Sequence, residues 1–194
     1  MNLPQILGLI AGILISVGYI PYVYEVLIKK TVPSRASWII WSISTIIIAI
    51  SVQLTGTTEA IWFPILDAAG CTLIFLLSIP YGSGGWTNTD KFTFAICIAS
   101  LIVWYATGNP LTALMMNLTV YVSGYIPTIG KVWRDPRHES RLAWSLFFAG
   151  SLVNLIAVLI GNDTGFAVWF YPVVLMIAVG SLYALLLRHP RKYI

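Results

Sequence analysis

Long apolar segments alternate with short polar ones along the whole chain. Each apolar segment is close to the ~20 residues that a helix needs to cross about 30 Å of hydrocarbon. The segments lack the in–out alternation of membrane β-strands, and a helix satisfies its own backbone hydrogen bonds in lipid. The predicted spans cover residues 4–27, 35–54, 60–79, 91–108, 110–133, 141–161 and 165–187. The pattern therefore predicts an all-α integral membrane protein with seven transmembrane helices.

The composition supports the same class of protein. Hydrophobic residues make up 58% of the chain and charged residues 9%, whereas soluble domains carry about a quarter charged residues. The mean hydropathy is +0.86, and we predict no soluble domain. The first apolar segment is longer than the ~7–15-residue core of a signal peptide and follows no Lys or Arg, so we expect it to be retained. Cys71 and Cys97 lie in apolar segments and are interpreted as packing residues, not as a disulfide.

Basic residues predict the orientation in the membrane. With seven spans, all eleven Lys and Arg fall on one side, and the ionisable residues of the other side are Glu59 and Asp163. The basic residues are Lys29, Lys30, Arg35, Lys91, Lys131, Arg134, Arg137, Arg141, Arg188, Arg191 and Lys192. The positive-inside rule then places the basic loops and the C-terminus in the cytoplasm and the N-terminus outside. We expect the protein to lie in the plasma (inner) membrane. Orientation accounts for the net charge of +4, and no nucleic-acid partner is predicted.

Aromatic residues gather near the predicted span ends, where amphipathic rings favour the membrane–water interface. The cytoplasmic belt is predicted to contain Trp38, Trp41, Trp133 and Trp144. The outer belt is predicted to contain Trp62, Trp104, Tyr105, Trp169 and Tyr171.

The chain contains an internal repeat. The tetrapeptide Gly-Tyr-Ile-Pro occurs at residues 18–21 and 124–127, an offset of 106 positions (124 − 18). The same offset relates Ser34 to Ser140, Arg35 to Arg141 and Trp38 to Trp144. An offset of 108 positions (170 − 62) relates the third helices through residues 62–64 and 170–172. A helix end, a basic loop and the start of the next helix thus occur twice.

The repeat divides the chain into two three-helix units. Residues 1–82 form the first unit, 83–109 a linker helix, and 110–194 the second unit with its basic tail. Because one span separates the units, both begin on the same side, which predicts a 3+1+3 parallel repeat about an axis along the membrane normal. Solute sites in such proteins lie near the midplane, where the halves meet. One chain supplies both halves, so an oligomer is possible but not required.

Each unit has a helix that ends near a proline, then a short basic loop, then a helix that begins near a tryptophan. This order resembles the PQ-loop superfamily. The 3+1+3 plan with an outside N-terminus resembles the SWEET/MtN3 sugar facilitators within that superfamily. The family's Pro-Gln pair corresponds to Pro21-Tyr22 and Pro127-Thr128, so glutamine is absent from both copies. The second helix of each unit also lacks the proline common in sugar facilitators. The resemblance implies a transporter that moves a sugar by alternating access.

Proline within the first and fifth spans marks candidate hinges. Proline removes a backbone donor and clashes with the preceding turn, so it kinks a helix; simple irregularity tolerated by neighbouring helices is the alternative. Equivalent positions in both units favour a pair of hinges that open and close a cytoplasmic gate. The hinge and gate candidates are Gly18, Tyr19, Pro21, Gly124, Tyr125 and Pro127.

Asp67 is the ionisable residue that lies well inside a predicted span. A carboxylate in the membrane is costly when left alone, so it should face the bundle interior or water. Three roles are open: proton coupling, a hydrogen bond to a polyol or amine substrate, or a link in a polar network. Its repeat counterpart is Leu175, so the site is predicted to be asymmetric.

Amides and aromatic rings supply the other candidate substrate contacts. Asn117 and Asn154 lie in apolar spans, where an amide either binds a solute or joins two helices. Aromatic faces beside such amides suit a sugar or an amino acid. The aromatic substrate-binding candidates are Trp62, Trp169 and Tyr171.

The remaining motifs give no reason to predict an enzyme. The seventh span carries no lysine for a retinal Schiff base, and the chain shows no metal-ligand cluster, catalytic triad order or phosphate-binding glycine loop. We therefore expect no metal or cofactor, and the partners are a small-molecule solute and the lipid bilayer. The leading hypothesis is a transporter of a small polar solute, with a sugar as the substrate class that the resemblance implies. A proton-coupled transporter of amino acids or other small metabolites is the nearest alternative, and a non-transporting seven-helix receptor or sorting protein is the third.

Overall fold

The computed structural model describes residues 1–54, 61–84, 88–108, 110–161 and 165–188, and over these residues it is all-helical, without a named β-strand. The elements are α1 (Leu3–Leu27), α2 (Arg35–Leu54), α3 (Trp62–Tyr81), α4 (Asn88–Thr107), α5 (Pro110–Ser123), α6 (Tyr125–Arg134), the 3₁₀ turn η1 (Pro136–His138), α7 (Arg141–Leu159) and α8 (Phe166–Leu187). Outside 110–133, each predicted helix agrees with an observed one to within three residues at either end.

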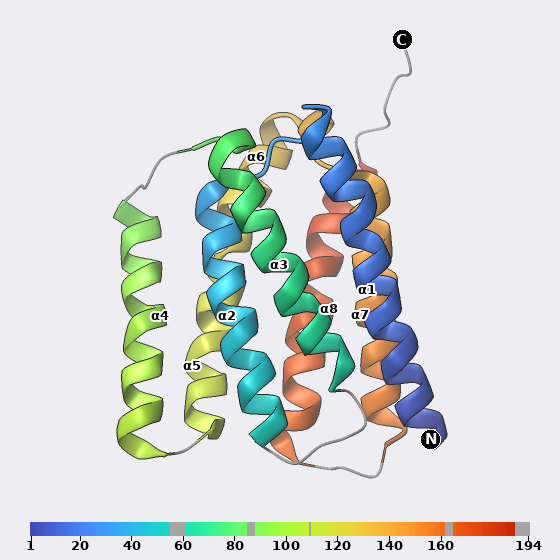
Figure 1. The fold of residues 1–194 in the computed structure, drawn as a ribbon, viewed down its shortest axis with the longest axis vertical. Helices are drawn as coiled ribbons and strands as arrows, with labels where there is room; N and C mark the ends of the chain where they lie inside the picture. Colours follow the sequence, from blue (N-terminus) through green and yellow to red (C-terminus); the bar gives the residue numbers. More distant parts are fainter. Residues whose placement is uncertain (55–60, 85–87, 109, 162–164, 189–194) are drawn as a thin grey trace.

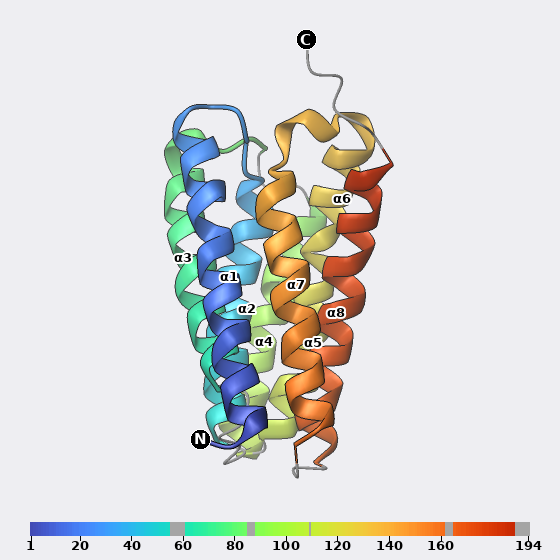
Figure 2. The ribbon, with the colours of Figure 1, turned by 90° about the vertical axis from the view of Figure 1, so that its right-hand side faces the viewer.

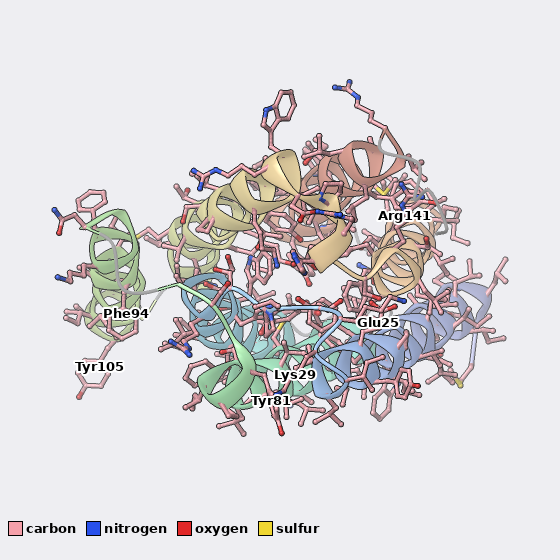
Figure 3. The ribbon with its side chains drawn as sticks, turned by 90° about the horizontal axis from the view of Figure 1, so that it is seen from above. Glu25, Lys29, Tyr81, Phe94, Tyr105 and Arg141 are labelled. Atoms are coloured by element: carbon pink, nitrogen blue, oxygen red, sulfur yellow. The ribbon has the colours of Figure 1, made fainter. Side chains whose placement is uncertain are left out.

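The helices stand side by side in a bundle (Figures 1 and 2). The most extensive contact joins α1 to α7; α1 also packs on α3, and α7 on α8. Helix α2 packs against α3 and α5. Helix α4 lies at the edge of the bundle, against α5 and α2, and its Tyr105 points away from the other helices (Figure 3).

Five helices in the described part of the chain are long and apolar enough to cross a membrane: α1, α2, α3, α7 and residues Trp169–Leu187 of α8. Their outward faces carry large apolar side chains, such as Ile20, Leu76 and Ile177, that are more than half exposed in the isolated chain. A contiguous exposed apolar surface of this kind suits contact with lipid. The fold is therefore that of an all-helical protein compatible with a membrane.

One end of the bundle, here called the basic end, carries the α1–α2 loop, α6, η1 and the last turns of α3 and α8, at the top of Figure 1. The N-terminus lies at the opposite end. The described basic residues all belong to segments at the basic end: Lys29, Lys30, Arg35, Lys91, Lys131, Arg134, Arg137, Arg141 and Arg188. Arg191, Lys192, Glu59 and Asp163, which also entered the orientation argument, lie outside the described residues.

The prediction of one helix over residues 110–133 was wrong, because the segment divides at Gly124 into α5 and α6. Two side chains donate hydrogen bonds to backbone carbonyls in the last turn of α5. Ser123 Oγ donates to Val120 O at 2.6 Å, and Trp41 Nε1 donates to Tyr121 O at 3.1 Å. The Gly124 N–H is shared between the same two carbonyls, at 3.2 Å each. Side-chain donors inserted into the backbone ladder are an established cause of helix interruption.

Candidate functional site

A buried cavity of about 20 Å³ lies in the middle of the bundle, between α1, α2, α3, α5, α6, α7 and α8. Such a volume holds about one water molecule. In this conformation the cavity therefore admits a small polar group but not a whole sugar or amino acid.

The twelve lining residues fall into six pairs related by the offsets of the sequence repeat. The offset of 106 relates Ile15 to Tyr121, Tyr19 to Tyr125, Trp38 to Trp144 and Trp41 to Phe147. The offset of 108 relates Asp67 to Leu175 and Cys71 to Val179. Both members of every pair face the same cavity, so each unit contributes the same six helix positions.

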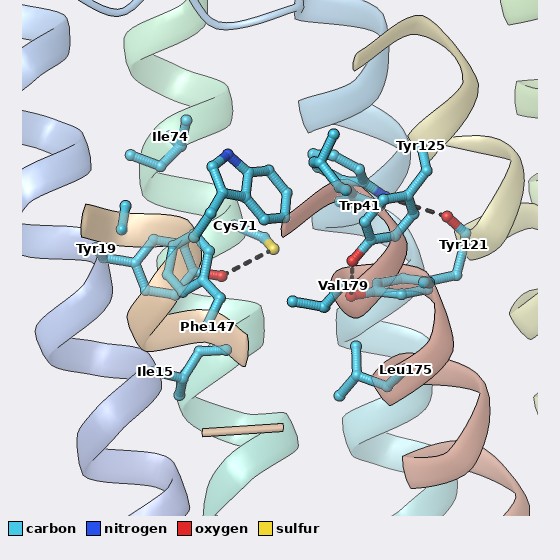
Figure 4. Packing of buried hydrophobic residues seen from close by; sticks show 14 of the residues in the cluster. Ile15, Tyr19, Trp41, Cys71, Ile74, Tyr121, Tyr125, Phe147, Leu175 and Val179 are labelled. Carbon is cyan, nitrogen blue, oxygen red and sulfur yellow. Dashed lines mark hydrogen bonds between the residues drawn. The ribbon is translucent and has the colours of Figure 1, made fainter. Parts of the chain in front are cut away.

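Aromatic rings form most of the lining, and they pack in the same way in the two units. The Tyr19 ring lies 4.8 Å from Phe147 between centroids, and the Tyr125 ring lies 4.8 Å from Trp41 (Figure 4). Trp41 also meets Trp38 edge to face at 5.1 Å. Edge-to-face and tilted pairs at these spacings are the favourable aromatic arrangements. The rings thus form a rigid lining rather than a loose one.

Glycine permits this close packing at the two predicted hinges. A Cβ added to Gly18 would come within 2.6 Å of the Phe147 ring. A Cβ added to Gly124 would come within 2.6 Å of Trp41 Nε1. Contacts that short do not occur, so both positions need glycine for the approach of a neighbouring aromatic residue.

Asp67 provides the charged group of the cavity. Its side chain is 3% exposed, and its Oδ1 accepts a hydrogen bond of 2.6 Å from the Tyr19 hydroxyl. Cys71 Sγ lies 3.2 Å from the same hydroxyl. Asp67 Oδ2 has no hydrogen-bond partner in the described part of the chain, and no described Lys or Arg forms an ion pair with this carboxylate. A buried carboxylate oxygen left in this way is a binding-site candidate.

The opposite wall lacks such a group. Leu175 and Val179 stand where the first unit has Asp67 and Cys71. The Tyr121 and Tyr125 hydroxyls lie 3.3 Å apart and hydrogen-bond to each other. The cavity is therefore polar toward α3 and apolar toward α8.

Three of the predicted substrate contacts are buried near the cavity without lining it. Asn117 Nδ2 donates to Ser44 O at 2.6 Å, which joins α5 to α2. Both polar side-chain atoms of Asn154 and the Tyr171 hydroxyl are buried and have no hydrogen-bond partner among the described residues. Asn117 and Tyr171 precede Tyr121 and Leu175 by one helical turn. They thus belong to a layer between the cavity and the opposite end.

The structure does not bring the other predicted aromatic contacts to the cavity. Trp62 and Trp169 are 47% and 38% exposed on the outside of the bundle. Conversely, Trp38, Trp41 and Trp144, which the sequence assigned to an interfacial belt, are buried at the cavity. The signal that points to them is the repeat itself, because the Trp38 and Trp144 pair recurs at the 106 offset.

A buried carboxylate closes the basic end above the cavity, and sequence reasoning missed it. Glu139 is 1% exposed, forms an ion pair with Lys131 and accepts a 2.8 Å hydrogen bond from Trp144 Nε1. The Tyr22 hydroxyl donates to it at 3.5 Å and accepts from Trp38 Nε1 at 3.2 Å. This network, the Glu139 cluster, connects the first unit to the second. Glu139 lies in a polar loop, where no local pattern distinguishes it from a solvated residue.

No family model, curated protein or solved structure matches the chain. The functional argument therefore depends on the cavity and on the repeat that surrounds it.

Proposed function

We propose that the protein is a membrane transporter that moves a small polar solute by alternating access between two three-helix units. The observation that carries the proposal is the central cavity, to which each unit contributes the same six positions. In this arrangement α1–α3 form the first unit, α4 the linker, and α5 to α8 the second unit, with α5 and α6 acting as one interrupted span. The basic end faces the cytoplasm by the positive-inside rule.

Two equivalent helix-end contacts support the parallel repeat. Arg35 Nε donates to Ser78 O at 3.0 Å, and Arg141 Nε donates to Leu186 O at 3.1 Å. The donors differ by 106 positions and the acceptors by 108 (186 − 78), the same offsets as at the cavity. The first helix of one unit also packs on the second helix of the other in both cases, as α1 on α7 and α5 on α2.

Alternating access requires that the two ends open in turn. The Glu139 cluster and the rings beneath it seal the basic end in this conformation. We propose that opening separates the Tyr22–Trp38 side of the cluster from the Lys131–Glu139 side. The break at Gly124 offers a hinge for α6, because the helix is already interrupted there.

The substrate class follows from the resemblance and from Asp67. The resemblance favours a sugar, which an energetically uncoupled facilitator would equilibrate. The unpartnered Asp67 Oδ2 favours the alternative of a proton-coupled carrier for amino acids or similar metabolites. The described titratable groups around this carboxylate are Tyr19 and Cys71 on the same side, Tyr121 and Tyr125 across the cavity, and Tyr171 one helical turn before Leu175.

Uptake into proteoliposomes tests the proposal, with labelled mono- and disaccharides and amino acids, with and without a pH gradient. Val179→Trp fills the cavity and should reduce uptake to the level of empty liposomes. Ile177→Trp, two residues away on the outward face of α8, is the matched control and should leave uptake unchanged.

The outcome separates the alternatives. Sugar uptake that only equilibrates and ignores the gradient indicates a facilitator. Uphill uptake that follows the gradient and is lost in Asp67→Asn indicates a proton-coupled carrier. Uptake in Val179→Trp equal to the wild-type rate would contradict a route through the cavity.

A further inference from the structure

The Asp67 carboxylate has no counter-ion among the residues that the structure describes. Asp67 lines the cavity; its Oδ1 accepts from the Tyr19 hydroxyl, and its buried Oδ2 has no hydrogen-bond partner among the described residues. The described Lys and Arg belong to the basic end, and none pairs with Asp67. A buried carboxyl group in such surroundings is stable when it pairs with a cation, or when it carries a proton and is neutral.

The indole donors of the cavity are already engaged. Trp38 Nε1 donates to the Tyr22 hydroxyl, Trp41 Nε1 to Tyr121 O and Trp144 Nε1 to Glu139. These three residues therefore offer a ligand their ring surfaces and no hydrogen-bond donor. Ring faces of tryptophan attract cations most strongly among the aromatic side chains.

The polar groups of the cavity also match a cation better than a sugar. A sugar hydroxyl both donates and accepts, and side-chain amides satisfy both needs. Asn117 and Asn154 do not line the cavity, and the Tyr121 and Tyr125 hydroxyls bond to each other. The Tyr121–Tyr125 pair uses one of its two O–H donors, so among the described lining residues the side-chain atom left with no partner at all is Asp67 Oδ2. An ionised carboxylate oxygen only accepts. An ammonium group only donates, and its head fits a cavity of about 20 Å³.

From these observations we propose that the cavity binds the ammonium group of a small organic cation, which pairs with Asp67 Oδ2 and lies against the rings of Trp38, Trp41 and Trp144. The inference rests on the proposed transport function for its route into the cavity and specifies the substrate of the same site. The solute is thus a primary or methylated amine, and its charge is what the site recognises.

Pairs of probes with the same shape and different charge test the inference on the purified full-length protein in detergent. Methylammonium is titrated against methanol and ethylammonium against ethanol, with glucose as a further neutral solute. Tryptophan fluorescence and calorimetry report binding. We expect each cation to bind about tenfold or more tightly than its neutral partner, as for a hydrogen bond to a charged group.

Variants then test whether the Asp67 carboxylate is the group that binds the cation. Asp67→Asn preserves the side-chain shape and should weaken cation binding about tenfold to a hundredfold without changing the response to the neutral probes. Asp135→Asn removes a carboxylate from the turn at the basic end and is the matched control, with binding unchanged. Trp41→Leu should weaken cation binding severalfold. The comparison of charged and neutral probes uses the wild-type protein, so it tests the charge selectivity of the site even where a variant fails to fold.

Three results would overturn the inference: equal affinity for methylammonium and methanol, saturation by glucose without saturation by the cations, or binding of none of these probes. Flux measurements in proteoliposomes separate this failure from failure of the proposed function. Charge-selective binding without flux of methylammonium or ethylammonium supports the site and contradicts transport. Sugar flux without cation binding supports transport and contradicts the site.

Discussion

The two copies of Gly-Tyr-Ile-Pro have the same sequence and differ in their helix hydrogen bonds. Residues 18–21 lie inside the single 25-residue helix α1, whereas residues 124–127 follow the break between α5 and α6. Proline occurs at the same place in both copies, so proline by itself does not interrupt the helix. The difference between the copies must come from what surrounds them.

Two hydrogen-bond donors account for the difference. Ser123, which takes Val120 O, corresponds to Val17 in the first copy. Trp41, which takes Tyr121 O, corresponds to Phe147, whose ring has no N–H. In a continuous helix the Tyr121 carbonyl would accept from the Tyr125 N–H instead. A local motif thus permits a break, and side chains from another helix decide whether it forms.

The same comparison applies to the cavity walls. Tyr19 and Tyr125 hold equivalent rings, yet one hydroxyl bonds to Asp67 at 2.6 Å and the other to Tyr121 at 3.3 Å. The framework of the cavity is shared, and its charge belongs to the first unit alone. The carboxylate of the Glu139 cluster belongs instead to the second unit alone, because the equivalent residue in the first unit is Pro33.

The largest expected effect comes from the Glu139 cluster. Glu139→Ala leaves Trp144 Nε1 without its buried acceptor and removes the charge partner of Lys131, whose Nζ keeps its hydrogen bonds to Val32 O and His138 O. We therefore expect a loss of about 3 kcal/mol of folding free energy. Thermal unfolding in detergent measures it. Asp135→Ala, in the same loop but partly exposed, should change the midpoint little. A midpoint for Glu139→Ala equal to that of the control would show that the cluster does not stabilise the closed end.

The tyrosine pair gives a smaller and more selective test. Tyr19→Phe removes the short bond to a buried carboxylate and should cost about 1–3 kcal/mol. Tyr125→Phe removes only the longer bond to Tyr121 and should cost less than about 1 kcal/mol. Equal shifts of the unfolding midpoint in the two variants would show that the two tyrosine hydrogen bonds stabilise the cavity walls equally.

The break at Gly124 should respond to its two donors. The double variant Ser123→Val, Trp41→Phe copies the first unit and removes the two side-chain donors that compete with backbone N–H groups for these carbonyls. We expect slower amide hydrogen exchange in residues 124–128, with a stability change of about 1 kcal/mol because one type of hydrogen bond replaces another. Phe147→Trp is the reciprocal control and should speed exchange in residues 18–22. Unchanged exchange in the double variant would assign the break to another cause.

The smallest effect is expected at the exposed turn of the basic end. Hydrogen bonds from the Arg137 side chain and backbone lower the pKa of Asp135 to about 2. A lowered pKa in the folded state stabilises it above the unfolded value of about 3.9, and this contribution is lost as pH falls toward 2. Asp135→Asn should remove that part of the pH dependence, worth at most about 1 kcal/mol because water screens the pair. Unfolding midpoints between pH 5 and 2.5 provide the comparison.

Part of the candidate site was accessible from the sequence. Asp67 is conspicuous as a carboxylate in an apolar segment, and Tyr19 and Tyr125 are marked by the repeat; the structure brings all three to one cavity. The indoles of Trp38 and Trp144 were assigned to the membrane interface because hydropathy cannot distinguish a helix end that faces lipid from one that faces another helix. Cys71 and Tyr121 carried no local signal at all.

The sequence by itself determined where the helices lie, their apolar character, the concentration of basic residues in particular segments and the offsets of 106 and 108. These properties depend on neighbouring residues in the chain, so periodicity, hydropathy and self-comparison detect them. Only the tertiary structure decided the break at Gly124, the burial of Glu139 beside Lys131 and the meeting of six residue pairs around one cavity. Each of these depends on contacts between residues far apart in the chain, where the partner of a hydrogen bond or a ring is set by packing and not by local pattern.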